Sequence, residues 1–71
     1  MIEIRLYING KYYDWFKLNY VPRVGEYVSF YYREVDDCVV AFVTKVVTDL
    51  ETHQVVVNVK LSGGIIPDFT E

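Results

Sequence analysis

The sequence predicts an all-β fold, a small antiparallel barrel of five strands that forms a single domain over residues 1–71. Three observations predict it. Apolar side chains alternate with polar ones along several short segments, which is the period of a strand with one buried face. Turn-forming residues separate these segments at intervals of about 8–12 residues. No segment repeats its apolar residues with the helical period of about 3.6, so the segments favour a closed or nearly closed barrel.

The first expected strand covers residues 2–8, where isoleucine and leucine alternate with charged or aromatic side chains. It ends at Asn9-Gly10. Asn-Gly favours a two-residue type I′ turn, because both positions accept a positive φ and the twist of this turn matches that of the flanking strands. We therefore expect a hairpin whose second strand starts at Lys11.

Regular pairing from that turn decides which side chains share a face. It sets Leu6 opposite Tyr13 and places Trp15 on the same buried side. The opposite side then carries large apolar groups as well, namely Tyr7, Tyr12, Phe16, Leu18 and Tyr20. A small barrel covers only one side of a hairpin. Either a bulge turns Phe16 and Leu18 inward, or the hairpin presents an aromatic surface.

A corner at residues 20–28 separates the first hairpin from the rest of the chain. Pro22 cannot donate to a strand ladder, and Gly25 accepts the positive φ of a tight turn. Residues 26–34 then alternate again, with Val28, Phe30 and Tyr32 on one face and Tyr27, Ser29, Tyr31 and Arg33 on the other. We expect a third strand here, followed by a polar turn at residues 35–37.

Two valine-rich segments predict the remaining strands. Residues 38–48 are apolar on both faces at their start, which is typical of a strand that is buried on both sides or bent midway. A loop over residues 49–53 follows, whose Leu50 we expect to fold over the core. Residues 54–61 point Val55, Val57, Val59 and Leu61 to one face. Ile65 and Ile66 are candidates for a short closing strand.

One element resembles a known group of folds. The pattern P-x-x-G-E-x-V, formed by Pro22, Gly25, Glu26 and Val28, enters a strand, and a V-x-x-V segment, residues 43–46, and a final valine strand follow it. Over residues 20–61 the chain resembles the SH3-like small barrels, in particular short single-barrel proteins of bacteria and phages. The resemblance implies the fold and no fixed activity.

Size and composition narrow the function classes. A chain of 71 residues buries a thin core, and its single cysteine excludes an internal disulfide, so self-association is a reasonable way to gain stability. The apolar runs are far shorter than the roughly 20 residues of a membrane span. Charges at Glu3 and Arg5 interrupt the first apolar segment, unlike a signal peptide. We expect a cytoplasmic location and no membrane partner.

The sequence predicts no catalytic residue, no metal site and no cofactor. His53 lies in a polar loop without a nucleophile or carboxylate arranged around it. Cys38 begins an apolar run, where a small buried or edge thiol is the ordinary interpretation. Glu34, Asp36 and Asp37 lack the spacing and glycine of a calcium loop, and we interpret them as solvated turn residues. We expect a protein that is not an enzyme and has no small-molecule substrate.

The aromatic content is the feature that points to a function. The chain has seven tyrosines, four phenylalanines and one tryptophan, more than one small core can hold. Tyrosine also occurs on strands because of its β propensity, and this alternative stays open. As a contact residue, it combines a large area with a polar tip. We expect a partner-binding surface that includes Tyr7, Tyr12, Tyr20, Arg23, Tyr27 and Tyr31.

Two functions fit this surface. The first is a non-catalytic protein-interaction module, of the kind a phage uses to inhibit a host protein, whose partner is another protein or a second copy in a homodimer. Acidic residues of the later turns would steer it toward a basic partner. The alternative is a single-stranded nucleic-acid-binding barrel, in which aromatic side chains stack on bases beside cations such as Lys11 and Lys17. The net charge of -3 counts against this alternative.

Overall fold

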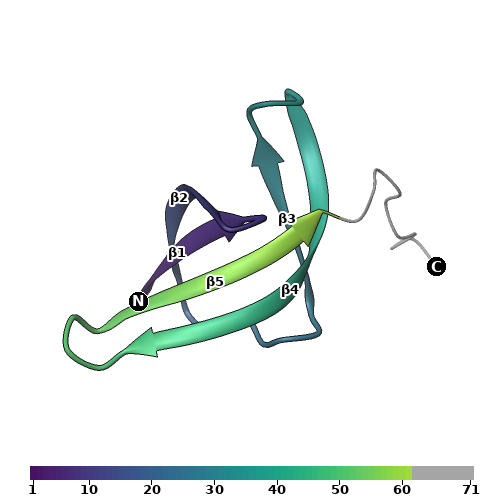
Figure 1. Ribbon diagram of the computed structural model, residues 1–71. Helices are drawn as coiled ribbons and strands as arrows, with labels where there is room; N and C mark the ends of the chain where they lie inside the picture. Colours follow the sequence, from purple (N-terminus) through teal and green to yellow (C-terminus); the bar gives the residue numbers. More distant parts are fainter. Residues whose placement is uncertain (62–71) are drawn as a thin grey trace.

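The computed structural model describes residues 1–61, which form one curled sheet of five strands with the shape of half a barrel (Figure 1). The predicted all-β fold and the number of strands are confirmed within these residues. The strands are β1 (Ile2–Ile8), β2 (Lys11–Leu18), β3 (Tyr27–Tyr32), β4 (Asp37–Asp49) and β5 (Gln54–Leu61). The closing strand expected at Ile65 and Ile66 lies outside the described residues.

The strand order is β2-β1-β5-β4-β3, and the sheet is mixed. Three neighbouring pairs are antiparallel, but β1 and β5 run parallel, with Ile4 beside Val55 and Ile8 beside Val59. The expectation of a purely antiparallel barrel was therefore wrong. Turn residues fix the directions of strands that follow one another closely, whereas β1 and β5 are joined through the whole intervening chain, and no turn sets their relative direction.

The first hairpin contains a bulge, which confirms the alternative in which Phe16 and Leu18 turn inward and reverses the faces that regular pairing gave to β2. Tyr7 pairs with Tyr12 as predicted, but Leu6 pairs with Asp14 rather than Tyr13, so Tyr13 is the extra residue. Beyond the bulge the faces exchange. Phe16 and Leu18 turn inward and pack against the core. Trp15, expected on the buried side, faces outward and is 49% exposed.

The core lies on the concave side of the three central strands. Its buried members come from β1, β4 and β5, which have neighbours on both edges. They are all aliphatic: Ile4, Leu6, Ile8, Ala41, Val43, Val55, Val57 and Val59. Phe16 and Leu18 of β2 and Phe30 of β3 pack against this cluster while half-buried, because the edge strands have the open side of the half barrel next to them.

The corner and the last strands agree with the sequence pattern in most details. Asn9, Gly10 and Gly25 have φ values of 52°, 85° and 96°, as the predicted turns require. β4 bends at a bulge between Val43 and Lys45, which confirms a bend midway along it.

One expectation about the loop after β4 was wrong, and the two alternatives left open for Cys38 are decided in favour of the edge position. Leu50 is 82% exposed rather than folded over the core, because the tight turn after Asp49 carries it outward. Cys38 is exposed, since the start of β4 extends past the end of β5, whose pairing with β4 ends at Ala41.

Candidate functional site

The outer face of the first hairpin carries an exposed aromatic group. Tyr7 and Tyr12 are paired across the strands, with their rings in an edge-to-face arrangement and their centroids 5.6 Å apart. Trp15 pairs with Arg5 on the same face. Tyr12 and Trp15 are 48% and 49% exposed, while Tyr7 is half-buried. We call Tyr7, Tyr12 and Trp15 the β1–β2 aromatic patch.

Cations surround this patch. The ammonium of Lys17 lies 5.9 Å from the centre of the Trp15 ring, within the range of a cation–π contact. Arg5 forms an ion pair with Glu3 at 3.4 Å, and its Nε is buried without a hydrogen-bond partner. Lys11 is exposed at the start of β2 but pairs with Ile8, so it shares the opposite face. The patch is therefore an apolar surface with a rim that is more basic than acidic.

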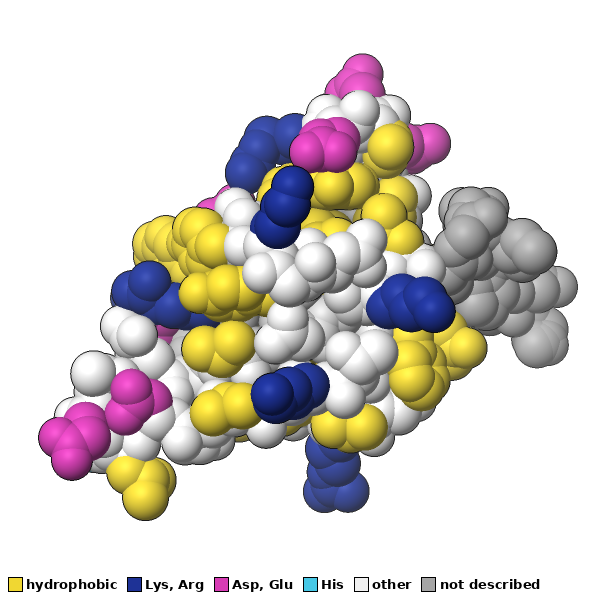
Figure 2. Space-filling model, in the orientation of Figure 1, with side chains coloured by type: hydrophobic (Ala, Val, Ile, Leu, Met, Phe, Trp, Pro, Cys, Tyr) yellow, Lys and Arg dark blue, Asp and Glu magenta, His cyan; other side chains and the backbone are white. Residues whose placement is uncertain are grey.

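Most acidic side chains of the described residues lie in two turns. Figure 2 shows basic side chains spread over the middle of one face, with acidic ones gathered at two ends of the molecule. These ends are the β3–β4 turn, with Glu34, Asp36 and Asp37, and the β4–β5 loop beside Asp49 and Glu51. Acidic charge is thus concentrated in these two turns, with Glu3, Asp14 and Glu26 outside them.

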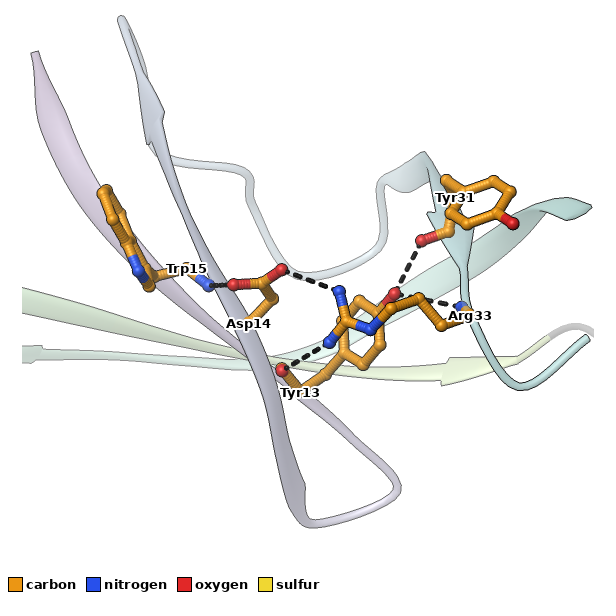
Figure 3. A network of polar contacts seen from close by, with 5 residues as sticks. All are labelled: Tyr13, Asp14, Trp15, Tyr31 and Arg33. Atoms are coloured by element: carbon orange, nitrogen blue, oxygen red, sulfur yellow. Dashed lines mark hydrogen bonds and ion pairs between the residues drawn. The ribbon is translucent and has the colours of Figure 1, made fainter. Parts of the chain in front are cut away.

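A second polar and aromatic cluster joins the two edge strands, which have no neighbouring strand on their far sides among the described residues (Figure 3). The Tyr13 hydroxyl donates to the backbone oxygen of Tyr31 at 2.8 Å and accepts from the backbone nitrogen of Arg33 at 3.1 Å. The guanidinium of Arg33 lies 4.3 Å from the centre of the Tyr13 ring and 3.1 Å from a carboxylate oxygen of Asp14. We call Tyr13, Asp14, Tyr31 and Arg33 the β2–β3 bridge.

The bridge shifts the protonation of its members. The pKa of Asp14 lies below its ordinary value, first because the backbone N–H of Trp15 donates to the carboxylate and then because Arg33 donates to it. The pKa of Tyr31 is raised, mainly because its hydroxyl donates to the Asp36 carboxylate. Both groups are therefore held in the protonation state they have at neutral pH.

Two hollows flank the bridge. The larger, about 450 Å³, lies between the tip of the first hairpin and the β3–β4 turn. Three tyrosines, two cations and Glu34 contribute to its lining: Lys11, Tyr12, Tyr13, Tyr32, Arg33 and Glu34. The smaller, about 110 Å³, opens between β2 and β3 and is apolar apart from Ser29.

The predicted contact residues do not form one surface. Tyr7 and Tyr12 belong to the β1–β2 aromatic patch. Tyr31 belongs to the β2–β3 bridge, and Tyr27 stacks edge-to-face on Phe42 with centroids 5.3 Å apart on the outer face of β3 and β4. Tyr20 and Arg23 are exposed in the corner between β2 and β3. Six residues chosen from the sequence thus lie in four places.

Comparison with known proteins finds no match. No family model, no curated protein and no solved structure is similar to this chain. Within residues 1–61, no three acidic, histidine or cysteine side chains are placed to hold a metal ion. The same residues include no helix that is long and apolar enough to cross a membrane.

The regular register left Trp15 and Tyr13 out of the predicted protein-contact surface, although a bulge was the open alternative. Regular pairing without a bulge places both Trp15 and Tyr13 on the buried face, so it predicts neither the exposure of Trp15 nor the contacts of Tyr13 at the edge of the sheet. The sequence contained a signal for the bulge. Phe16 and Leu18 can share the buried face of the first strand only if one unpaired residue precedes them in the second strand.

Proposed function

We propose that this protein is a non-catalytic interaction module that binds another protein through the β1–β2 aromatic patch. The observation that carries the proposal is the exposure of Tyr12 and Trp15, about half of each side chain, on one face of a hairpin that also holds Tyr7. Tyrosine and tryptophan are enriched among residues that dominate binding energy, because they bury a large area while keeping a polar group for hydrogen bonding.

The basic rim indicates the chemistry of the partner. Arg5 and Lys17 share the face of the patch, with Glu3 the acidic residue paired on the same face. A partner with an apolar centre and an acidic border matches this rim. This differs from the basic partner expected from the acidic turns, of which the β3–β4 turn places Glu34 in the same hollow as Tyr12. Such a module could act in the cytoplasm as a phage-type inhibitor of a host protein. The resemblance to SH3-like barrels of bacteria and phages is consistent with this role.

The test removes the patch and keeps the fold. The double variant Tyr12→Ser/Trp15→Ser should lose capture of the partner from a host lysate, with a loss of at least about 2 kcal/mol in binding if the two residues are central. Tyr20→Ser/Leu50→Ser is the matched control, since it removes two large exposed apolar side chains outside the patch. Circular dichroism and the thermal midpoint check folding. Equal capture by both double variants contradicts the proposal.

Self-association is tested in the same preparation. If the partner is a second copy, sedimentation of the wild-type chain gives a dimer mass that Tyr12→Ser/Trp15→Ser reduces to the monomer mass. A monomer at all concentrations assigns the patch to a different protein.

The larger hollow favours one second candidate, a single-stranded nucleic acid. Tyr12, Tyr13 and Tyr32 line it together with Lys11 and Arg33, and stacking surfaces beside cations are the features such binders use. Glu34 on the same lining opposes phosphate binding. A labelled oligothymidine should bind at low salt, weaken as salt is added, and weaken further in Lys11→Glu. Absence of binding at low salt excludes this candidate.

A further inference from the structure

The opening between β2 and β3, which we call the seam, is bordered by strand edges that have no neighbouring strand within residues 1–61. The backbone oxygen of Tyr31 accepts from Tyr13 across the seam, so this residue points its backbone groups away from β4. Backbone groups alternate in direction along a strand. Ser29 and Tyr27 therefore also direct their N–H and C=O groups into the seam, and the described backbone pairings give them no partner there.

The edge of β2 is better protected than the edge of β3. The N–H of Trp15 points away from β1 and donates to the carboxylate of Asp14 at 2.8 Å, while the backbone oxygen of Tyr13 accepts from Arg33 at 3.4 Å. Side chains that occupy edge groups in this way block the addition of a strand. On β3, the corresponding protection ends at Tyr31, and Ser29 and Tyr27 are exposed in the part of the chain that the structure describes.

The seam is too wide for the two edges to pair with each other. No Cα atom of β2 lies within 8 Å of a Cα atom of β3. Paired strands are about 4.8 Å apart, so the barrel does not close through its own described strands at this position. The β2–β3 bridge spans the seam at one end with side chains alone (Figure 3).

The apolar hollow lies within the rest of the seam. Its walls include Phe16 and Leu18 from β2 and Val28 and Phe30 from β3, and Val57 of β5 contributes to its lining. Its volume of about 110 Å³ is several times the share of one water molecule in the liquid, about 30 Å³. A branched aliphatic side chain therefore fits.

We propose that an extended segment of the partner protein adds to the edge of β3 at Tyr27 and Ser29 and inserts an aliphatic side chain into the hollow. Of the ligands a small barrel can bind, an extended polypeptide alone presents backbone donors and acceptors at the spacing of a strand edge. Alternate side chains of such a segment face the same side, which directs one of them into the hollow. This inference rests on the proposed function, because it takes the partner to be a protein.

The test uses a synthetic peptide in which valine alternates with threonine and glutamate. Titrated into the isotope-labelled full chain at up to millimolar concentration, it should shift the amide resonances of Tyr27 and Ser29 in a saturable way. The same peptide, N-methylated at alternate positions along the pairing edge, keeps its side chains and loses those donors. It should bind at least about tenfold more weakly. Equal binding of the two peptides, or no shift at Tyr27 and Ser29, overturns the proposal.

Two variants at one position test the site on the protein. Ser29→Pro removes the N–H that faces the seam, a change that an edge strand tolerates on its open side, and should weaken peptide binding by about three- to tenfold. Ser29→Ala keeps the N–H and is the control, with unchanged affinity expected. If Ser29→Ala weakens binding as much as Ser29→Pro, the serine hydroxyl rather than strand pairing is responsible and the proposal fails.

The result separates this inference from the proposed function. Tyr12→Ser/Trp15→Ser should lose the partner and still bind the peptide, because neither residue lines the apolar hollow. Loss of partner capture in that variant, together with no peptide binding to the wild-type chain, rejects the seam and keeps the patch. Dimerisation that Ser29→Pro abolishes assigns the seam to a second copy and overturns the proposed occupant.

Discussion

Tyr13 determines two features of the fold, the register of the first hairpin and the contact between the two edge strands. As the extra residue of the bulge, it lets Phe16 turn inward and Trp15 outward. Its hydroxyl also contacts two backbone groups at the far edge of the sheet. One side chain thus exchanges the faces of β2 and joins that strand to the end of β3.

Tyr13→Phe should separate these two effects. The ring, which packs 5.3 Å from Tyr32 and 5.8 Å from Phe30 between centroids, stays in place. The two hydrogen bonds are lost, and each contributes about 0.5–1.5 kcal/mol. We expect a fall of about 1–3 kcal/mol in the free energy of unfolding, measured by urea denaturation. Tyr12→Phe is the control, because Tyr12 meets Tyr7 through its ring. An equal effect of the two changes contradicts the role given to the bridge.

Asp14 gives the protein a specific acid sensitivity. Its pKa is lower in the folded chain than the ordinary 3.8, so the folded state binds this proton less readily than the unfolded state. The stabilisation is present above the unfolded value and is lost as the pH falls from about 4 through the lower folded value. Thermal midpoints of the wild type and Asp14→Asn should differ at pH 6 and converge by about pH 2. A difference that is constant over this range excludes ionisation of Asp14 as its cause.

Among the elements, the turns were more predictable than the bulges. Asn9-Gly10, Gly25 and the alternation of β3 follow from residue type, because positive φ and the period of two leave few alternatives. The bulge at Tyr13 does not follow in this way. Local pairing preferences allow both registers, and the choice depends on burying Phe16 and Leu18 against strands from the other end of the chain. The aromatic patch was therefore found only in part.

The corner before β3 tests whether stability depends on the backbone conformation of Gly25. Its φ of 96° disfavours any L-residue, although a Cβ at this position would meet nothing within 4 Å. Gly25→Ala should therefore lower stability by about 1–2 kcal/mol through backbone strain alone. A chain of 71 residues is accessible to chemical synthesis, so D-alanine at the same position is a direct control. It accepts positive φ and should be at least as stable as the wild type. Equal losses with both forms of alanine would indicate a steric cause.

At the scale of the whole molecule, the sequence predicted the strands and not how their two groups join. Residues of β1 and β5 carry strong strand patterns, but the pattern of a strand contains no information about the direction of a distant neighbour. The composition of the candidate surface was unpredictable for the same reason. Tyr27 and Tyr31 were rightly placed on one face of β3, yet which other aromatics would lie beside them depended on the order of the strands.

The parallel pairing of β1 with β5 has a consequence for how the chain reaches this structure. The β1–β2 hairpin and the β3–β4–β5 meander can each form from neighbouring segments, but the shared core needs Ile4 to Ile8 beside Val55 to Val59. Closing so long a loop is entropically costly and slow compared with forming a hairpin. During synthesis, the first hairpin leaves the ribosome before β5 does. Its aliphatic face therefore stays without its partner strand until β5 has been synthesised.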